Sequence, residues 1–434
     1  MRGCKSALFI TILCLILFPA AAQECPRLTV ADAIRTAVSG NPLLDAARRR
    51  ALAARADIGS ARADLFPQVD VQAQYTHESA PASIQIPGTP QTITVGVSDS
   101  TVTSINARQY IYTGGRLPAL ISQAEALYDA AVAQLGSAEA DTALQVRQAF
   151  YNVLLAQANV TAQERNLSAA QSQLRDANTR FEAGVSARFD VLRAETQVSQ
   201  AEQSLLEARN SVETAFVALN RAMGVPQSRR WTIVDPGLAP LPAEPLPDLV
   251  AAARRGRGEV LAARAQAAAQ EAGINIARAE GLPTLSIAAS YNIVSTQNSF
   301  QSSGWIISAT AALNLFNGGR TRADVSAAQA RTEEARANLE DVTQGVEQDV
   351  RQSYLNLVTS QRTMDTAETT LRQAEEAYDV ATVRYQAGVG TATELADALA
   401  QLAQARANLN QARYNYNIVW ARLQRALGRI ACPI

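Results

Sequence analysis

The feature that most constrains this chain is an internal duplication. Residues 112–116, Tyr-Thr-Gly-Gly-Arg, recur at 316–320 as Phe-Asn-Gly-Gly-Arg, and residues 180–185, Arg-Phe-Glu-Ala-Gly-Val, recur at 384–389 as Arg-Tyr-Gln-Ala-Gly-Val. Both pairs are 204 residues apart. Upstream, Phe66-Pro67 and Leu282-Pro283 are 216 residues apart. The first copy therefore carries about twelve extra residues, as expected for a surface loop, and the fold is predicted to consist of two similar halves.

Each half has the same predicted order of parts: a helix that ends before a proline, two strands, a very long helix, a glycine turn and a further helix. The predicted helices are 41–65, 116–181 and 189–223 in the first half, and 258–281, 320–385 and 393–427 in the second. The predicted organisation is a signal peptide at 1–22, a first repeat at 23–235, a Pro-rich linker at 236–247 and a second repeat at 248–434.

The N-terminus predicts export. Arg2 and Lys5 precede an apolar run at 7–18, and Ala20-Ala21-Ala22 resembles a signal-peptidase site, so the mature chain is expected to begin at Gln23. Cys25 leaves lipid attachment open as an alternative, although Glu24 is not the small residue expected before a lipidated cysteine. Cleavage would leave two cysteines, close to the two ends of the chain.

Four segments have the period of two that is typical of β-strands with one apolar and one polar face. They begin near Val69, Thr101, Leu285 and Trp305, and the last is predicted to continue to Leu315. Such strands fit either a soluble sheet or an outer-membrane barrel, and the export signal favours the barrel. Four strands cannot close a membrane barrel, because the smallest needs about eight, so copies of the chain must pool their strands.

The long helices predict a rod. Residues 116–181 would span roughly 100 Å at 1.5 Å per residue, far more than a bilayer. Hydrophobic residues make up 47% of the chain but aromatic residues only 5%, and the apolar helix positions are mostly alanine, which allows helices to approach closely. An exported coiled-coil structural protein would share this pattern, but it would need neither amphipathic strands nor a pore.

Composition and motifs argue against several classes of function. The net charge of −1 does not suit a broad nucleic-acid-binding surface. His77 is the only histidine, and neither a phosphate-binding loop, a Cys/His cluster nor a hydrolase elbow is present in the sequence. The sequence therefore predicts neither an enzyme nor a cofactor or metal site.

Taken together, the duplication, the two Gly-Gly-Arg junctions, the paired tip segments and the late Ala-Arg-Tyr-Asn-Tyr at 412–416 resemble the TolC-like outer-membrane efflux family over the whole mature length. The resemblance implies a mainly α-helical homotrimer with a 12-stranded β-barrel in the outer membrane of a Gram-negative bacterium and a helical tunnel in the periplasm. It implies an exit duct fed by a periplasmic adaptor and an inner-membrane transporter of RND, ABC or MFS type. The duct of a type I protein secretion system is the alternative within this fold.

The resemblance also implies roles for individual residues. Glu394 and Asp397 match an acidic ring at the periplasmic aperture, although acidic residues also favour any helix start. Asp190, Tyr385 and Arg413 match polar links that hold the tip closed, whereas Gly390 stands where the family carries an arginine. The adaptor would contact the two tip turns, formed by Gly184, Val185 and Ser186 and by Gly388, Val389, Gly390 and Thr391.

The two mature cysteines, Cys25 and Cys432, are expected to form a disulfide, because the resemblance implies that both chain ends lie in the middle of the tunnel. Paired cysteines of exported proteins persist as disulfides in the oxidising compartment that they enter. A lipidated Cys25 and two free thiols are the alternatives.

Overall fold

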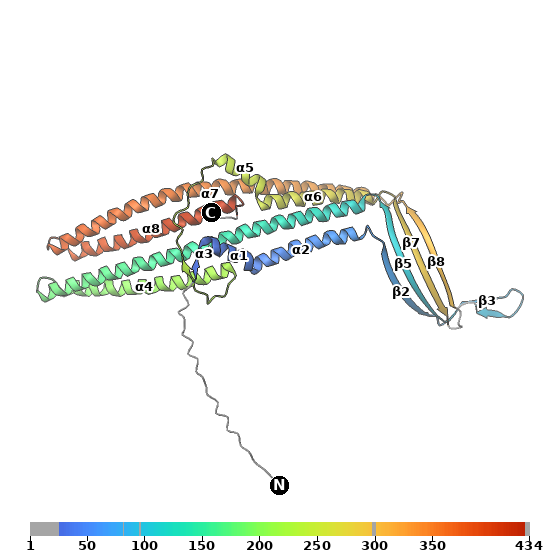
Figure 1. The fold of residues 1–434 in the computed structure, drawn as a ribbon, viewed down its shortest axis with the longest axis horizontal. Helices are drawn as coiled ribbons and strands as arrows, with labels where there is room; N and C mark the ends of the chain where they lie inside the picture. The colour runs from blue at the N-terminus through green and yellow to red at the C-terminus, as the bar shows by residue number, and fades with distance from the viewer. Residues whose placement is uncertain (1–25, 81, 95–96, 297–300, 430–434) are drawn as a thin grey trace, which may run out of the picture.

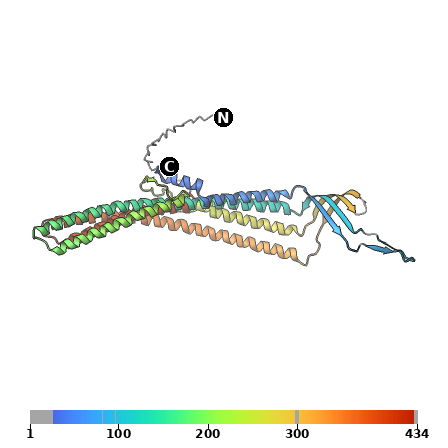
Figure 2. The same cartoon turned by 90° about the horizontal axis from the view of Figure 1, so that it is seen from below.

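The structure, a computed structural model, describes residues 26–80, 82–94, 97–296 and 301–429. The molecule is elongated, with a four-stranded sheet at one end and the turns of two helical hairpins at the other (Figures 1 and 2). The predicted signal peptide and the predicted Cys25–Cys432 disulfide lie outside the described residues.

Two helices of equal length form the frame. α3 (Arg116–Glu182) and α7 (Arg320–Gln386) each have 67 residues, and each begins after a glycine with positive φ, +86° at Gly115 and +85° at Gly319. Two further left-handed glycines, Gly184 and Gly388, lie in the hairpin turns at the far ends. Glycine adopts this backbone conformation without steric cost, so the duplicated Gly motifs determine where both long helices begin and end.

Shorter helices lie end to end along this frame, as the sequence predicts. α2 (Pro42–Ala63) and α4 (Arg188–Met223) pack along α3, and α6 (Gly258–Ala279) and α8 (Ala392–Ala426) pack along α7. Both ends of all six helices agree with the predicted helices to within two residues. α3 also contacts α6 and α8, so the two repeats pack side by side.

The strands form one antiparallel sheet in the order β2 (Gln68–His77), β5 (Asp99–Thr113), β7 (Thr284–Thr296) and β8 (Gln301–Ala312). The register gives the sheet two unlike faces. One row across all four strands is Val71, Ile105, Tyr291 and Trp305, and the adjacent row on the opposite face is Gln72, Ser104, Asn292 and Gly304. Val71 and Trp305 are 70% and 72% exposed in the single chain, so the apolar face is bare.

The structure differs from the predicted sheet at one strand end, and it adds a small hairpin that was not predicted. β8 ends at Ala312 rather than at Leu315, because the chain there turns toward the Gly318-Gly319 junction that starts α7. In the twelve-residue insertion, β3 (Ser83–Gln85) pairs with β4 (Thr92–Thr94), and this small hairpin projects beyond the sheet (Figure 1). The prediction that the insertion forms a surface loop is confirmed.

The middle of the molecule contains four elements that the sequence analysis did not predict. α1 (Val30–Gly40) packs on α3 and α4, and α5 (Leu246–Gly256) packs on α7. β1 (Arg27–Leu28) pairs in parallel with β6 (Thr232–Ile233). The Pro-rich linker is extended up to Pro245, and its last two residues already belong to α5.

The bulky core lies at this level in two clusters, one mainly in each repeat. Phe150, Leu219 and Met223 are buried between α3 and α4, and Leu249, Leu357 and Leu423 are buried between α5, α7 and α8. Burying such side chains stabilises a fold by about 1.5–3 kcal/mol each. The middle therefore holds the helices together, while alanines line much of the remaining helix contacts.

No helix within the described residues has the length and the apolar character needed to cross a bilayer.

The two faces of the sheet generate a first prediction. Ile287→Arg, on the apolar face of β7, should impair membrane insertion, because arginine on a lipid-facing strand position costs about 2–4 kcal/mol near the midplane. Ser290→Arg, on the polar face of the same strand, is the matched control and should insert normally. The readout is the fraction of folded protein recovered in the outer-membrane fraction. Equal recovery of the two variants would contradict the assignment of faces.

Candidate functional site

The hairpin turns at the helical end lie side by side and are joined across the repeats. Arg180 of α3 donates from Nη2 to the carbonyl oxygens of Tyr385 (2.7 Å) and Gln386 (3.0 Å) of α7, and its guanidinium lies 4.3 Å from the centre of the Tyr385 ring. A second bond, from Arg193 Nη1 to Thr393 Oγ1 (2.6 Å), joins α4 to α8. These contacts form a bridge between the two hairpins at their tips.

Tyr385 is the buried centre of this bridge. It is only 6% exposed, and burial raises the pKa of its hydroxyl, while the Arg180 charge opposes that rise. The carboxylate of Asp190 acts on the same hydroxyl through its charge. The structure therefore places Asp190 and Tyr385 together, and adds Arg180, which the sequence analysis missed. Their role in holding a closed tip stays a prediction.

Five of the seven predicted tip residues, all except Gly184 and Val389, line an open hollow of about 770 Å³ between the two turns. Val185 and Val389 are exposed at 72% and 70%, one on each turn. Each turn is closed by a backbone bond back to an arginine, from Val185 N to Arg180 O and from Val389 N to Arg384 O, both 3.0 Å. The turns thus present two matching apolar side chains on a rigid backbone.

Gly390 has a steric reason to lack a side chain. A Cβ at this position would lie 3.0 Å from the Tyr385 backbone nitrogen and 3.1 Å from two atoms of Arg384. The Gly390 N–H donates to the Arg384 carbonyl at 3.0 Å, which holds the backbone in this tight position. The geometry of the turn therefore disfavours an arginine at 390, and the contact between the two hairpins is made instead by Arg180 of the first repeat.

The predicted acidic pair lies at the start of α8, where Thr391 caps the helix by accepting from the Glu394 N–H at 3.1 Å. Glu394 is half exposed and 3.8 Å from Arg384, and Asp397 is exposed one turn further on. Leu395, next to Glu394 in the helix, is buried. Glu394 and Asp397 share an exposed helix face, as predicted from their spacing of three.

Arg413 is not at the tip. It lies 21 residues beyond the start of α8, which is roughly 30 Å along the helix, and its guanidinium forms an ion pair with Asp235, the residue just before the linker, at 3.3 Å. Tyr414 donates to the same carboxylate at 3.2 Å. Within one chain Arg413 therefore fastens the residue before the linker to α8, which corrects the expectation that it links the tip.

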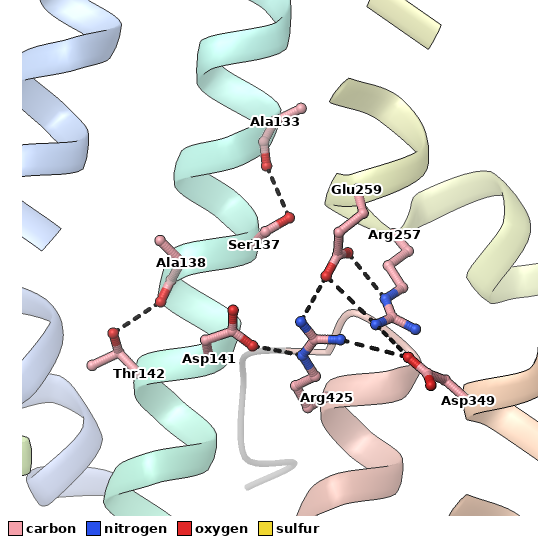
Figure 3. Close-up of polar contacts among 9 residues, drawn as sticks. All are labelled: Ala133, Ser137, Ala138, Asp141, Thr142, Arg257, Glu259, Asp349 and Arg425. Atoms are coloured by element: carbon pink, nitrogen blue, oxygen red, sulfur yellow. Dashed lines mark hydrogen bonds and ion pairs between the residues drawn. The ribbon is translucent and has the colours of Figure 1, made fainter. Parts of the chain in front are cut away.

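A second polar site joins the repeats in the middle of the molecule (Figure 3). Arg257 donates to Glu259 (3.0 Å) and Asp349 (2.9 Å), and Arg425 donates to Asp141 (2.6 Å) and Glu259 (2.7 Å). These five residues, which we call the equatorial ion cluster, come from α3, α6, α7, α8 and the N-cap of α6. Arg257 is only 4% exposed. Three carboxylates face two guanidinium groups, so the cluster carries one excess negative charge.

The surroundings of the ion cluster raise the pKa values of two of its acids, Glu259 and Asp349. Burial raises the pKa of Glu259, and the nearby carboxylates of Asp141 and Asp349 raise it further. Burial also raises the pKa of Asp349. Such a cluster is held by its arginines, and removing one would leave uncompensated charge. Within the described ranges, no group of three or more His, Cys, Asp or Glu side chains is arranged to hold a metal ion.

An amphipathic four-stranded sheet joined to helices of about 100 Å defines a class, the ducts that pass from the outer membrane into the periplasm. The family model described as "Outer membrane efflux protein" matches residues 33–225 and 249–429, one match in each repeat. The chain belongs to this family. It is an outer-membrane efflux component of a Gram-negative bacterium, with a helical part that extends into the periplasm.

Individual relatives agree with this assignment. The outer membrane protein TolC of Vibrio cholerae serotype O1 is 27% identical over 398 residues, which cover 90% of this chain and 88% of that protein. The pyoverdine export outer membrane protein OpmQ of Pseudomonas aeruginosa is 26% identical, with coverage of 81% and 78%. Among solved structures, the outer membrane protein VceC of Vibrio cholerae has a TM-score of 0.79 at 22% identity and covers 92% of this chain and 96% of its own, which supports the fold.

The ion cluster generates a second prediction. Arg425→Gln should destabilise the protein by about 2 kcal/mol, less than the 3–5 kcal/mol of fully buried pairs because Arg425 is 21% exposed. Arg221→Gln is the matched control, since Arg221 is the duplicated counterpart, is exposed and has no carboxylate within 4.0 Å in the described structure. It should change stability by about 0.5 kcal/mol at most.

The loss in Arg425→Gln should also depend on pH. Carboxyl groups with raised pKa values contribute stability that is complete below their unfolded pKa and is lost as the pH rises through the raised value. The deficit of Arg425→Gln should therefore shrink between pH 7 and pH 5, because the carboxylates left behind take up protons. Denaturant unfolding of the purified protein at both pH values measures this, and a deficit that grows on acidification would refute the account.

Proposed function

We propose that three copies of this chain form one continuous duct through which an inner-membrane transporter and a periplasmic adaptor expel compounds across the outer membrane. The observation that carries the proposal is the sheet. The outer edges of its two edge strands, β2 and β8, have no strand partner within the described chain, and its apolar face is bare. Backbone groups in lipid must be paired, so these edges require strands from other copies. Three copies supply twelve strands, enough for a closed barrel.

The helical part supports a passive role. The lumen of such a duct would be lined by exposed polar faces of the long helices, and neither a nucleotide site nor a catalytic group is recognisable in the sequence. Energy therefore comes from the transporter. The two tip turns, with Val185 and Val389 exposed, suit contact with an adaptor, because a small exposed apolar group on a rigid turn can dock into a groove.

The type of cargo is not encoded in an obvious site. The relative OpmQ is named for export of pyoverdine, which agrees with an efflux role for small compounds. A polar duct built from generic side chains selects weakly, so the partners at the inner membrane determine what is exported. The same reasoning keeps secreted polypeptide as the alternative cargo within this fold.

Assembly and conductance test the proposal together. The protein purified in detergent should have the mass of a trimer once bound detergent is subtracted, and it should form discrete conducting channels in planar bilayers. A chain that conducts as a monomer would refute the pooling of strands. A trimer that never conducts, even with both Tyr385 and Arg180 replaced by alanine to loosen the tip, would refute the duct.

The acidic pair generates a further prediction. In a threefold assembly Glu394 and Asp397 would each form a ring of three carboxylates, which attracts multivalent cations. Glu394→Ala with Asp397→Ala should weaken the block of conductance by a trivalent cation added on the periplasmic side, by on the order of tenfold. Glu244→Ala with Asp248→Ala removes the same two charges from the linker and α5 and should leave the block unchanged. Unaltered block in the first variant would mean that the pair is only a solvated helix start.

A further inference from the structure

Positive charge is concentrated in the middle of the molecule. Residues 26–50 and 221–257, which we call the equatorial belt, hold eleven arginines and five acidic residues, a formal charge of +6. The whole chain carries −1. The belt comprises β1, α1, the start of α2, the end of α4, β6, the linker and α5. α1 and α5 lie beside the long helices, about midway between the sheet and the tips (Figure 1).

Several arginines of the belt are not used to hold the fold together. They are exposed, and none has a carboxylate within 4.0 Å in the described part of the chain: Arg27, Arg50, Arg221, Arg229 and Arg255. The Arg229 guanidinium lies 4.4 Å from the centre of the Trp231 ring, which holds it in place at the surface. Arg255 donates from Nε to the Ala251 carbonyl at 3.2 Å, which leaves its other donors facing solvent.

Clustered like charge destabilises a fold through self-repulsion unless a counter-charge is bound. Ion pairs with acidic residues inside and outside the belt reduce this repulsion only in part. Arg230 pairs with Glu213, and Arg49 pairs with Asp45 at 3.5 Å, but the five arginines above remain. Guanidinium groups bind carboxylates through paired, parallel N–H donors, so a surface of unpaired arginines fits a ligand that bears many carboxylates.

We propose that the equatorial belt binds peptidoglycan, the carboxylate-bearing peptide-crosslinked glycan of the periplasm, and so anchors the duct in the cell wall. A rod that hangs from the outer membrane into the periplasm must pass through this polymer. The belt is the level at which the rod carries unpaired positive charge. The inference rests on the outer-membrane placement of the chain, and the proposed trimer would repeat the belt three times around the tunnel.

The position of the belt disfavours an anionic lipid as its ligand. The belt packs against α3 residues 143–154, which lie roughly 40–60 Å along the helix from its start beside the sheet. Electrostatic attraction to a lipid surface falls off within a Debye length of about 8 Å at physiological salt. The belt is therefore out of reach of the membrane that holds the sheet.

Co-sedimentation with purified sacculi tests the proposal on the full-length mature protein in detergent. The belt variant replaces five arginines by glutamine: Arg27, Arg50, Arg221, Arg229 and Arg255. The control variant replaces five exposed tunnel-helix arginines that also lack a carboxylate within 4.0 Å: Arg165, Arg175, Arg322, Arg331 and Arg372. Both variants lose the same charge.

We expect the wild type and the control variant to pellet with sacculi, and the belt variant to bind more weakly by on the order of tenfold. Binding of the wild type should fall as salt is raised, and it should be lost on sacculi whose carboxyl groups have been amidated. This last arm needs no mutation, so it decides the question even where the belt variant assembles poorly.

Three results would overturn the inference: equal binding of the belt variant and the wild type, equal loss in both variants, or binding to phosphatidylglycerol vesicles but not to sacculi. None of these requires conduction. Single-channel recording of the same preparations separates a failure of anchoring from a failure of the proposed duct.

Discussion

The structure depends on one constraint, the hydrogen-bonding groups along the two open edges of the sheet. A sheet in water can leave its edges to solvent, but in lipid each unpaired backbone group costs several kcal/mol. With only four strands, one chain cannot pair its own β2 with its own β8. The chain therefore supplies one part of a larger barrel. Its bare apolar sheet face and its long helices with exposed flanks are features of a part rather than of a complete protein.

The helical region divides its stability unevenly. Bulky side chains such as Phe150 and Leu423 are buried at the equator, where the ion cluster also ties the two repeats together. Toward the tips, about half of the buried apolar positions are alanine, and Ala177 and Ala194 pack between α3 and α4. Close packing of small residues stabilises less per residue than burial of large ones. The equator thus holds the two repeats together most strongly, and the tips are joined by a few specific contacts such as the one from Arg180 to Tyr385.

Much of this architecture could be predicted because its signals are local. Period-two alternation identified the strands, and glycines that need positive φ identified the ends of the long helices. The two helices that were missed, α1 and α5, have eleven residues each, and their apolar faces are buried only by packing against α3 and α7. The site was less predictable for the same reason. Arg180 contacts a residue 205 positions away, and Arg413 contacts Asp235, 178 positions away, so neither partner can be found from spacing along one helix.

The equal lengths of α3 and α7 have a consequence for how this architecture can vary. Both helices begin at a Gly-Gly-Arg junction and end at an Ala-Gly-Val turn, so their ends lie in two common planes. An insertion in one long helix alone would make one hairpin turn protrude beyond the other at the helical end. Only insertions of the same length in both helices would keep the two hairpin turns at the same level. The length of the helical part is therefore set by both repeats, and it can change only if both long helices change by the same number of residues.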